Sequence, residues 1–394
     1  MYGKIILKRG KEESLKRFHP WVFSGALHSA EGNLEDGDLV KVFTHGGDFV
    51  AVGHFQRGTI SVRVLSFSDE EIDFGFFKGR IGEALSLRRQ SGLAGGNTGD
   101  TFRLVHGEGD RLPGLVVDCY GNTAVVQSHS AGMHRSRHEI ARAIEEVMGG
   151  GIANVYYKSE TTLTAGRDQG LQDGFLVGGG NCGNIGVENG LKFKVDWLKG
   201  QKTGFFIDQR ENRSLLERYS HGESVLNMFC YTGGFSVYAM RGGAAKVHSV
   251  DSSAKAISIT DENMALNFPG DNRHTSFCED AFRFLSAPGE QYGTVVLDPP
   301  AFAKHRSSIR NALKGYIRLN AMGMGRVKPG GVLFTFSCSQ VVSKDDFRNA
   351  VFTAAIHAGR RARILHQLHQ PADHPVDVFH PEGEYLKGLV LRID

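Results

Sequence analysis

The chain has 394 residues, of which 40% are hydrophobic and 23% are charged, and its formal net charge is +3 at pH 7. This composition is too apolar and too weakly charged for a disordered protein, and the 51 glycines follow no collagen-like triplet repeat. The five cysteines contain no C-x-x-C pair, which excludes a zinc site and a disulfide framework and fits a reducing cytoplasm. No signal-peptide core and no apolar run of membrane-spanning length is visible, so we expect a cytoplasmic protein.

Residues 1–70 have the pattern of a small β-rich unit. Short segments that alternate apolar and polar residues, such as LVKVF (39–43) and FVAVGHF (49–55), are separated by clusters of turn-forming residues. One helix-like segment, EESLKRFHPWVF (12–23), interrupts them. A helix over Phe74–Ser91 and a glycine-rich loop at 92–99 are expected to follow.

The next part of the chain, to about residue 185, reads as a central α/β unit. Two strands joined by a turn are predicted within 102–128, a long helix near Gly132–Met148, and a strand at ANVYYK (153–158). The glycine-rich stretch 178–186 is the best candidate for a domain boundary.

From about residue 187 strands alternate with helices. After a β stretch at Leu191–Trp197 and a helix at Gln209–Tyr219, apolar strands are predicted at 225–229, 246–251, 275–278, 294–298 and 332–337, each followed by a helical stretch. This alternation predicts a mostly parallel sheet with helices on both faces. Ligands of such sheets lie outside the carboxyl ends of the strands, so the residues that end each strand are the informative ones.

The first three strands end in residues suited to a nucleoside ligand. A turn with Gly233 and Gly234 follows the first strand and allows close approach of the backbone, although the G-x-G-x-x-G pattern of dinucleotide-binding proteins is missing. Asp251 ends the second strand, where it could accept hydrogen bonds from ribose hydroxyls or serve as a helix N-cap. Asp280 follows the third strand and could receive an adenine amine or cap the helix that begins at Ala281.

The last two strands end in residues suited to chemistry. The fourth runs into Asp298-Pro-Pro-Ala-Phe302, whose prolines would hold the Asp298 carboxylate rigidly and whose Phe302 could stack on a flat ring; the alternative is a rigid turn without further role. Cys338 follows the fifth strand, and we interpret it as a nucleophile rather than a core residue.

Positive charge is concentrated between the two candidate catalytic residues. The interval between Asp298 and Asp345 has no acidic residue, and it holds Lys304, Arg306, Arg310, Lys314, Arg318, Arg326, Lys328 and Lys344. Solvated helix faces normally mix charges of both signs, so this interval indicates phosphate contacts.

These motifs in combination resemble a known family. The chain is similar to the class I S-adenosylmethionine-dependent RNA (cytosine-5) methyltransferases of the rRNA large subunit methyltransferase I type. The resemblance covers essentially the whole chain and is carried by HPWVFSGAL (19–27), RLVHGEGDRLPGLVVDCYG (103–121), GFFIDQRENR (204–213), NMFCYTGGFS (227–236), DPPAF (298–302), FSCS (336–339) and DHPVDVFHPEGEYLKGLVLRI (373–393).

The resemblance implies three domains and an α/β fold. We expect a PUA-like RNA-binding β-barrel at 1–70, a central α/β domain at 71–185, and a Rossmann-like, seven-stranded methyltransferase domain with helices on both faces at 186–394. It also implies S-adenosylmethionine as cofactor and 23S rRNA of the large subunit as partner, with no membrane and no metal, and it allows a homodimer.

The resemblance also assigns residues to the site. Cofactor contacts are implied for Phe206, Asp208, Gln209, Arg210, Asn227, Phe229, Tyr231, Thr232, Gly233, Asp251, Ser252, Asp280, Ala281 and Asp298. Cys338 would be the nucleophile and Asp298 would orient the target base, while Pro299, Phe302, Lys304, Arg306 and Arg310 would meet the RNA. The DPPAF motif lacks the second cysteine that many RNA cytosine-5 methyltransferases carry for product release, so either another base removes the C5 proton and completes release or the chemistry differs.

Other functions remain open from the residues alone. The DPPAF turn could present its carbonyl and carboxylate groups to an exocyclic amine, which would make the protein an RNA N-methyltransferase with Cys338 as a bystander. A non-catalytic RNA-binding factor in ribosome assembly is a third hypothesis, which the intact set of strand-end residues disfavours.

Overall fold

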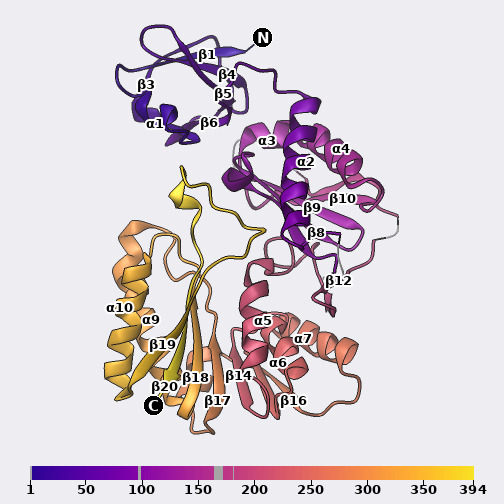
Figure 1. The fold of residues 1–394 in the computed structure, drawn as a ribbon, viewed down its shortest axis with the longest axis vertical. Helices are drawn as coiled ribbons and strands as arrows, with labels where there is room; N and C mark the ends of the chain where they lie inside the picture. The colour runs from indigo at the N-terminus through magenta and orange to yellow at the C-terminus, as the bar shows by residue number, and fades with distance from the viewer. Residues whose placement is uncertain (1, 96–98, 164–171, 181) are drawn as a thin grey trace. The chain divides into compact units, whose positions relative to one another are not determined.

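The computed structural model describes residues 2–95, 99–163, 172–180 and 182–394 (Figure 1). Residues 96–98 of the predicted loop and residue 181 of the predicted boundary stretch lie outside the described residues. The chain divides into two compact units. The first comprises Met1–Gly190, Val195–Ile207 and Ala372–Gly383, and the second comprises Leu191–Lys194, Asp208–Pro371 and Glu384–Asp394. The division into three domains at residues 70 and 185 stays a prediction.

The first unit begins with a six-stranded sheet in the order β2-β6-β5-β4-β1-β3. All its pairings are antiparallel except that of β1 with β4. Ile5, Val40 and Val62 are fully buried in its core. The elements are β1 (Gly3–Leu7), α1 (Glu13–Lys16), β2 (Trp21–Phe23), η1 (Ser24–Ala26), β3 (Leu27–Glu31), β4 (Leu39–Phe43), β5 (Phe49–Phe55) and β6 (Ile60–Ser66).

The prediction of a helix over residues 12–23 is mostly wrong. Only Glu13–Lys16 is helical, and Trp21–Phe23 pairs with β6 as a strand. The chain leaves the helix at Phe18, whose φ of 62° is left-handed. Pro20 favours extended backbone at the residue before it, which separates the short helix from the strand.

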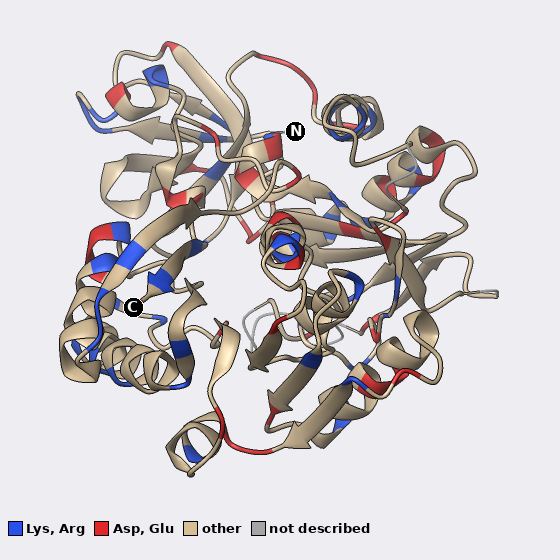
Figure 2. Cartoon of the chain, turned by 60° about the horizontal axis from the view of Figure 1, so that its bottom comes forward, with Lys and Arg blue, Asp and Glu red and all other residues tan. Residues whose placement is uncertain are grey.

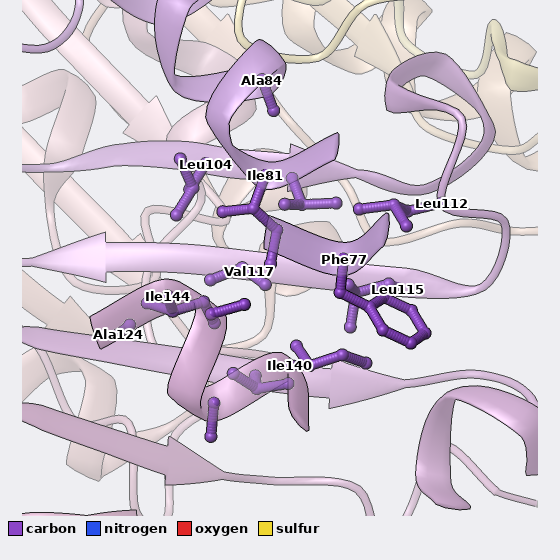
Figure 3. Close-up of a cluster of buried hydrophobic side chains, with 14 of the residues drawn as sticks. Phe77, Ile81, Ala84, Leu104, Leu112, Leu115, Val117, Ala124, Ile140 and Ile144 are labelled. Atoms are coloured by element: carbon purple, nitrogen blue, oxygen red, sulfur yellow. The ribbon is translucent and has the colours of Figure 1, made fainter. Parts of the chain in front are cut away.

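A second sheet of the first unit has the order β11-β10-β9-β8-β7. Figure 3 shows how Phe77 and Ile81 of α2, together with Ile140 and Ile144 of α4, point toward Val117 and other apolar side chains of the strands. The elements of this part of the chain are α2 (Phe74–Gln90), β7 (Phe102–His106), η2 (Gly107–Asp110), β8 (Leu115–Tyr120), β9 (Thr123–Ser128), α3 (Ala131–Arg135), α4 (Arg137–Met148), β10 (Asn154–Tyr157), β11 (Gly174–Val177) and, outside this sheet, β12 (Ile185–Glu188).

The helix predicted near Gly132–Met148 is two helices. Ser136, with φ −83° and ψ 5°, ends α3 and precedes α4. Serine competes with the helix through its own backbone hydrogen bonds, so it is favoured at helix ends rather than in helix interiors.

Two leucines of α2 offer a matched test of the core in Figure 3. Leu85 belongs to the same buried cluster and is 3% exposed, whereas Leu87, two residues along the same helix, is 38% exposed. Leu85→Ala is expected to lower the free energy of unfolding by about 2–5 kcal/mol because it opens a cavity. Leu87→Ala should lower it by less than about 1 kcal/mol, since exposed side chains contribute little. Urea denaturation measures both, and equal effects would contradict the packing described.

The second unit is built on a seven-stranded sheet in the order β16-β15-β14-β17-β18-β20-β19. The first five strands in this order run parallel, and β20 is antiparallel to both neighbours. The strands of the sheet are β14 (Ser224–Met228), β15 (Lys246–Asp251), β16 (His274–Cys278), β17 (Tyr292–Leu297), β18 (Val327–Ser337), β19 (Ala362–Leu368) and β20 (Lys387–Ile393). The second unit also contains β13 (Leu191–Lys194), which lies outside this sheet. The β stretch predicted at Leu191–Trp197 thus ends three residues early.

Helices cover both faces of this sheet, with α5, α6 and α7 on one side and α9 and α10 on the other (Figure 1). The predicted α/β class, with a largely parallel seven-stranded sheet, is confirmed. The helical segments are η3 (Ile207–Gln209), α5 (Arg210–Arg218), α6 (Gly234–Arg241), α7 (Ala254–Asn267), α8 (Ala281–Ser286), η4 (Arg306–Ser308), α9 (Ile309–Gly325), α10 (Lys344–Ala358) and, in the first unit, η5 (Pro381–Gly383). Within the described residues, none of the helices has the length and apolar character needed to cross a bilayer.

Candidate functional site

The predicted site residues of the second unit lie at one edge of its sheet. Because β16, β15, β14, β17 and β18 are parallel neighbours, their carboxyl ends share that edge. Asp280, Asp251, Phe229, Asp298 and Cys338 stand at or just beyond these ends, in the same order across the sheet. The sheet therefore brings together residues that lie far apart in the sequence.

The turn after β14 has a strained backbone. Phe229 and Tyr231 adopt φ values of 58° and 47°, which cost energy in residues other than glycine and are typical of functional sites. The Asp251 carboxylate holds this turn, since its Oδ2 accepts a hydrogen bond from the Tyr231 N–H at 2.9 Å. Gly233 has a φ of 78°, and a Cβ there would lie 2.6 Å from Cγ2 of Thr260. Only glycine therefore fits at position 233.

Two buried oxygen atoms in and beside this turn are open to a ligand. Asn227 donates through Nδ2 to Ser236 Oγ at 2.9 Å, but its Oδ1 has no hydrogen-bond partner among the described residues. Oγ1 of buried Thr232 also has none within the described part of the chain, although its carbonyl accepts from Asn263. Buried polar atoms are rarely left without a partner, so these two oxygens fit a bound group that donates hydrogen bonds.

The two aspartates after β15 and β16 differ in their local roles. Asp251 is not the N-cap of α7, because Ser253 caps that helix by accepting from the Ala256 N–H at 3.2 Å. That alternative interpretation of Asp251 is wrong. Asp280 does cap α8, with its Oδ1 2.9 Å from the Arg283 N atom. An adenine contact by Asp280 stays a prediction.

The turn after β17 is linked to the start of α5 and to the end of β18. Gln209 donates from Nε2 to Asp298 Oδ2 at 3.1 Å, and Asn212 fixes that amide by donating to Gln209 Oε1 at 2.6 Å. The Cys338 Sγ donates to the carbonyl oxygen of Pro299 at 3.8 Å. The two candidate catalytic residues, predicted from separate strands, are thus joined through the Asp-Pro turn.

The two neighbours of Cys338 in the sequence, Ser337 and Ser339, belong to a buried cluster of hydroxyl groups. The Ser337 hydroxyl donates to the Tyr316 hydroxyl at 2.9 Å, and the Tyr316 and Ser339 hydroxyl oxygens are 3.1 Å apart. Burial raises the pKa of Tyr316, so its hydroxyl stays protonated at neutral pH. The ring of half-buried Phe302 packs on Tyr316, with centroids 4.7 Å apart. This cluster fixes the backbone around the cysteine.

Two further residues of this edge were missed by the sequence analysis. Tyr385 donates from its hydroxyl to Asp208 Oδ2 at 2.6 Å. Lys387 is buried, and its Nζ donates to the carbonyl oxygens of Ser339 and Tyr385 at 2.9 and 2.7 Å. The available signal was a lysine at the head of the apolar strand KGLVLRI. Burial lowers the pKa of Lys387 to about 8.

The remaining predicted residues fall in both units. Gln209 and Arg210 are buried where α5 begins, Ser252 is exposed, and Ala281 is buried at the start of α8. Phe206 belongs to the first unit, where Lys202 Nζ lies 5.5 Å from the centre of its ring.

The basic residues predicted to contact RNA are accessible. Lys304, Arg306 and Arg310 are exposed in the loop after β17, in η4 and at the start of α9. Elsewhere in both units Lys and Arg are interspersed with Asp and Glu (Figure 2), which agrees with the small net charge. The described residues contain no group of three or more His, Cys, Asp or Glu side chains that could hold a metal ion.

Two segments of the chain match known protein families. Residues 5–67 match the family described as PUA-like domain, and residues 175–389 match the S-adenosylmethionine-dependent methyltransferase family. Among curated proteins, the ribosomal RNA large subunit methyltransferase I of Shewanella amazonensis is 40% identical over 400 residues, covering 99% of each chain. That of Aeromonas hydrophila is 38% identical over 406 residues and covers 100% of each chain.

Solved structures with the same fold share less sequence. A putative S-adenosylmethionine-dependent methyltransferase from Streptococcus mutans superposes with a TM-score of 0.84 at 22% identity, covering 100% of both chains. A structure of a putative methyltransferase complexed with SAH gives the same TM-score, identity and coverage. At this identity the likeness establishes the fold.

Proposed function

Because this chain belongs to the ribosomal RNA large subunit methyltransferase I family, within the S-adenosylmethionine-dependent methyltransferases, we propose that it forms 5-methylcytosine in the 23S rRNA of the large subunit. The enzyme class and the cofactor follow from the family, and the position of the methyl group is the proposal. The observation that carries it is the placement of Cys338, which follows β18 with its Sγ 3.8 Å from the carbonyl of Pro299, in the same turn as Asp298.

The edge of the sheet fits S-adenosylmethionine. The open acceptors Asn227 Oδ1 and Thr232 Oγ1 suit the ammonium group of its methionine part. Asp251 and Ser252 would hold the ribose and Asp280 and Ala281 the adenine. The other residues proposed to line the cofactor are Phe206, Asp208, Gln209, Arg210, Phe229, Tyr231, Gly233 and Asp298. The cofactor supplies an electrophilic methyl group on its sulfonium.

The chain's own residues then make cytosine reactive. C5 of cytosine is a poor nucleophile, and a bond from Cys338 Sγ to C6 turns the ring into an enamine-like species that reacts at C5. Asp298 would share a proton with the ring N3 and so stabilise the charge that develops on attack. After methylation the C5 proton leaves to water, the C6–S bond breaks, and its electron pair returns to sulfur.

The target cytosine must leave its stack to reach Cys338. Pro299 and Phe302 would line its path, and exposed Lys304, Arg306 and Arg310 would bind the flanking phosphates. The PUA-like domain adds a second RNA-binding module. A cytoplasmic location and a homodimer belong to the proposal as well.

Replacing Asp251 should weaken cofactor binding. Asp251→Ala removes the acceptor of the Tyr231 N–H and the proposed ribose contact, so we expect the Kd for S-adenosylmethionine to rise about 10- to 100-fold. Calorimetry measures this Kd. Asp271→Ala is the matched control, because Asp271 pairs with Arg273 before the amino end of β16 and should leave the Kd unchanged. Equal affinity of both variants would contradict the assigned site.

Nucleoside mass spectrometry tests the proposed function. Large-subunit rRNA is incubated with the protein and labelled S-adenosylmethionine, digested and analysed, and the label is expected on C5 of cytosine. A methyl group on an exocyclic amine would favour the N-methyltransferase alternative. No transfer despite cofactor binding would favour a non-catalytic role in ribosome assembly.

A further inference from the structure

Lys387 is buried where the catalytic thiol leaves the sheet. Because β20 runs antiparallel to β18, the first residue of β20 lies beside the last residue of β18, and Lys387 pairs with Ser337 in the register. Cys338 is the next residue after Ser337. The reversed strand thus brings a lysine to the carboxyl edge of a sheet whose neighbouring strands are parallel.

Two fixed hydrogen bonds hold the Lys387 amine in this place. Its Nζ donates to the carbonyl oxygen of Ser339, the residue after Cys338, and to that of Tyr385. A lysine ammonium has three N–H donors, so one remains after these two bonds. The Ser339 carbonyl therefore anchors the amine to the backbone directly after the thiol residue, and the Tyr385 carbonyl anchors it to its own segment.

Three ionisable groups of the described residues interact electrostatically with Lys387: Cys338, Glu384 before β20 and Lys344 at the start of α10. Glu384 and Lys344 form an ion pair with each other, 2.5 Å apart. A buried ammonium needs a compensating negative charge. With Glu384 engaged by Lys344, the Cys338 thiolate is the anion that suits Lys387.

We propose that Lys387 activates Cys338 by taking the proton of its thiol. The S–H bond breaks, an N–H bond forms on Nζ, and the electron pair stays on sulfur as a thiolate beside an ammonium. This inference rests on the proposed function, in which that sulfur attacks C6 of cytosine. Lys387 acts on the substrate through Cys338 and is in that sense a positioning residue.

The pKa of Lys387 and the order of the proposed reaction steps agree with this role. Burial brings the pKa of Lys387 to about 8, close to the ordinary value of about 8.5 for a cysteine thiol, so the proton can pass between them with little cost. When the C6–S bond breaks at the end of the reaction, the electron pair returns to the sulfur, and the resulting thiolate would be stabilised by the ammonium that Ser339 holds at the next residue. The Cys338 thiolate and the Lys387 ammonium are then ready for the next cytosine.

The pH dependence of thiol alkylation tests this proposal on the whole protein without RNA or cofactor. Iodoacetamide is added across pH 6–10, and mass spectrometry follows the labelled peptides of Cys338 and of exposed Cys278, an internal reference on β16. In the unsubstituted protein, the Cys338 rate should reach half its maximum below about pH 8.5, the ordinary thiol value. Lys387→Met should shift that midpoint upward by about one unit and slow alkylation at pH 7 about tenfold.

Two further variants control for structural effects. Lys387→Arg keeps the positive charge and should keep the Cys338 midpoint below that of Lys387→Met. Lys246→Met is the matched control, since Lys246 begins β15 at the opposite edge of the sheet and pairs with Glu290, and both midpoints should stay unchanged. The Cys278 rate should be the same in all four proteins.

Each outcome bears on the proposal separately from the proposed function. An unsubstituted midpoint at or above 8.5, or identical midpoints in Lys387→Met and the unsubstituted protein, would overturn it. The first measurement needs no variant, so it decides even if Lys387→Met does not fold. Nucleoside mass spectrometry is done in parallel. Methylation away from C5 would disprove the proposed function, but the alkylation result could still be interpreted. C5 methylation together with an unshifted alkylation midpoint in Lys387→Met would disprove only the role of Lys387.

Discussion

Cys338→Ala is expected to abolish methyl transfer to rRNA while leaving S-adenosylmethionine binding intact. The alanine cannot form the bond to C6, and loss of a covalent nucleophile costs on the order of 10⁴-fold or more in kcat. The side chain is half-buried at the end of β18 and is not part of the strained turn after β14 that is proposed to bind the cofactor, so the fold should tolerate the change. Transfer of label to RNA and calorimetry with the cofactor measure the two effects.

Cys278→Ala is the matched control for this loss. Cys278 ends β16 at the same edge of the sheet, is exposed, and has no role in the proposed reaction, so that variant should retain full transfer. Full activity of Cys338→Ala would eliminate the covalent mechanism and leave the N-methyltransferase alternative.

The second large effect is expected for Asp298→Asn, which should lower kcat about 100- to 1,000-fold with little change in KM. The asparagine keeps the shape of the side chain, and its oxygen can still accept the hydrogen bond from Gln209. It cannot share a proton with N3 as a carboxylic acid does, so stabilisation of the developing charge is lost. Single-turnover rates with excess enzyme measure the chemical step.

Gln209→Ala should have a smaller effect than Asp298→Asn, about tenfold in kcat, because it removes only the group that orients the carboxylate. An unchanged kcat in Asp298→Asn would contradict the role of Asp298. A loss in Asp298→Asn together with full activity in Cys338→Ala would identify the Asp-Pro turn as the site of an N-methylation.

The sequence predicted the second unit more accurately than the first. Its strands are apolar runs of buried parallel sheet, and the helices between them follow regularly, so the strands predicted at 225–229, 246–251 and 294–298 are found within two residues at either end. In the first unit, each of the two wrong helix predictions is explained by a single residue. Phe18 in a left-handed conformation ended a predicted helix, and Ser136 divided another.

The sequence by itself determined the parallel sheet, the family, and the residues that end its strands, because these follow from local patterns and short motifs. Asp251, Asp298 and Cys338 were predicted in this way to lie at or directly after strand ends, and they do. Only the tertiary structure decided which of these residues meet and what supports them. Gln209 reaches Asp298 across 89 positions, and Lys387 reaches Ser339 across 48.

The physical reason lies in the order and direction of the strands. Nothing local in KGLVLRI shows that β20 enters the sheet between β18 and β19 and runs against β18. That reversal brings Lys387 beside the cysteine, whereas a parallel β20 would place the same lysine at the opposite edge. The sequence thus supplied the proposed nucleophile, and the sheet topology supplied the amine that we propose activates it.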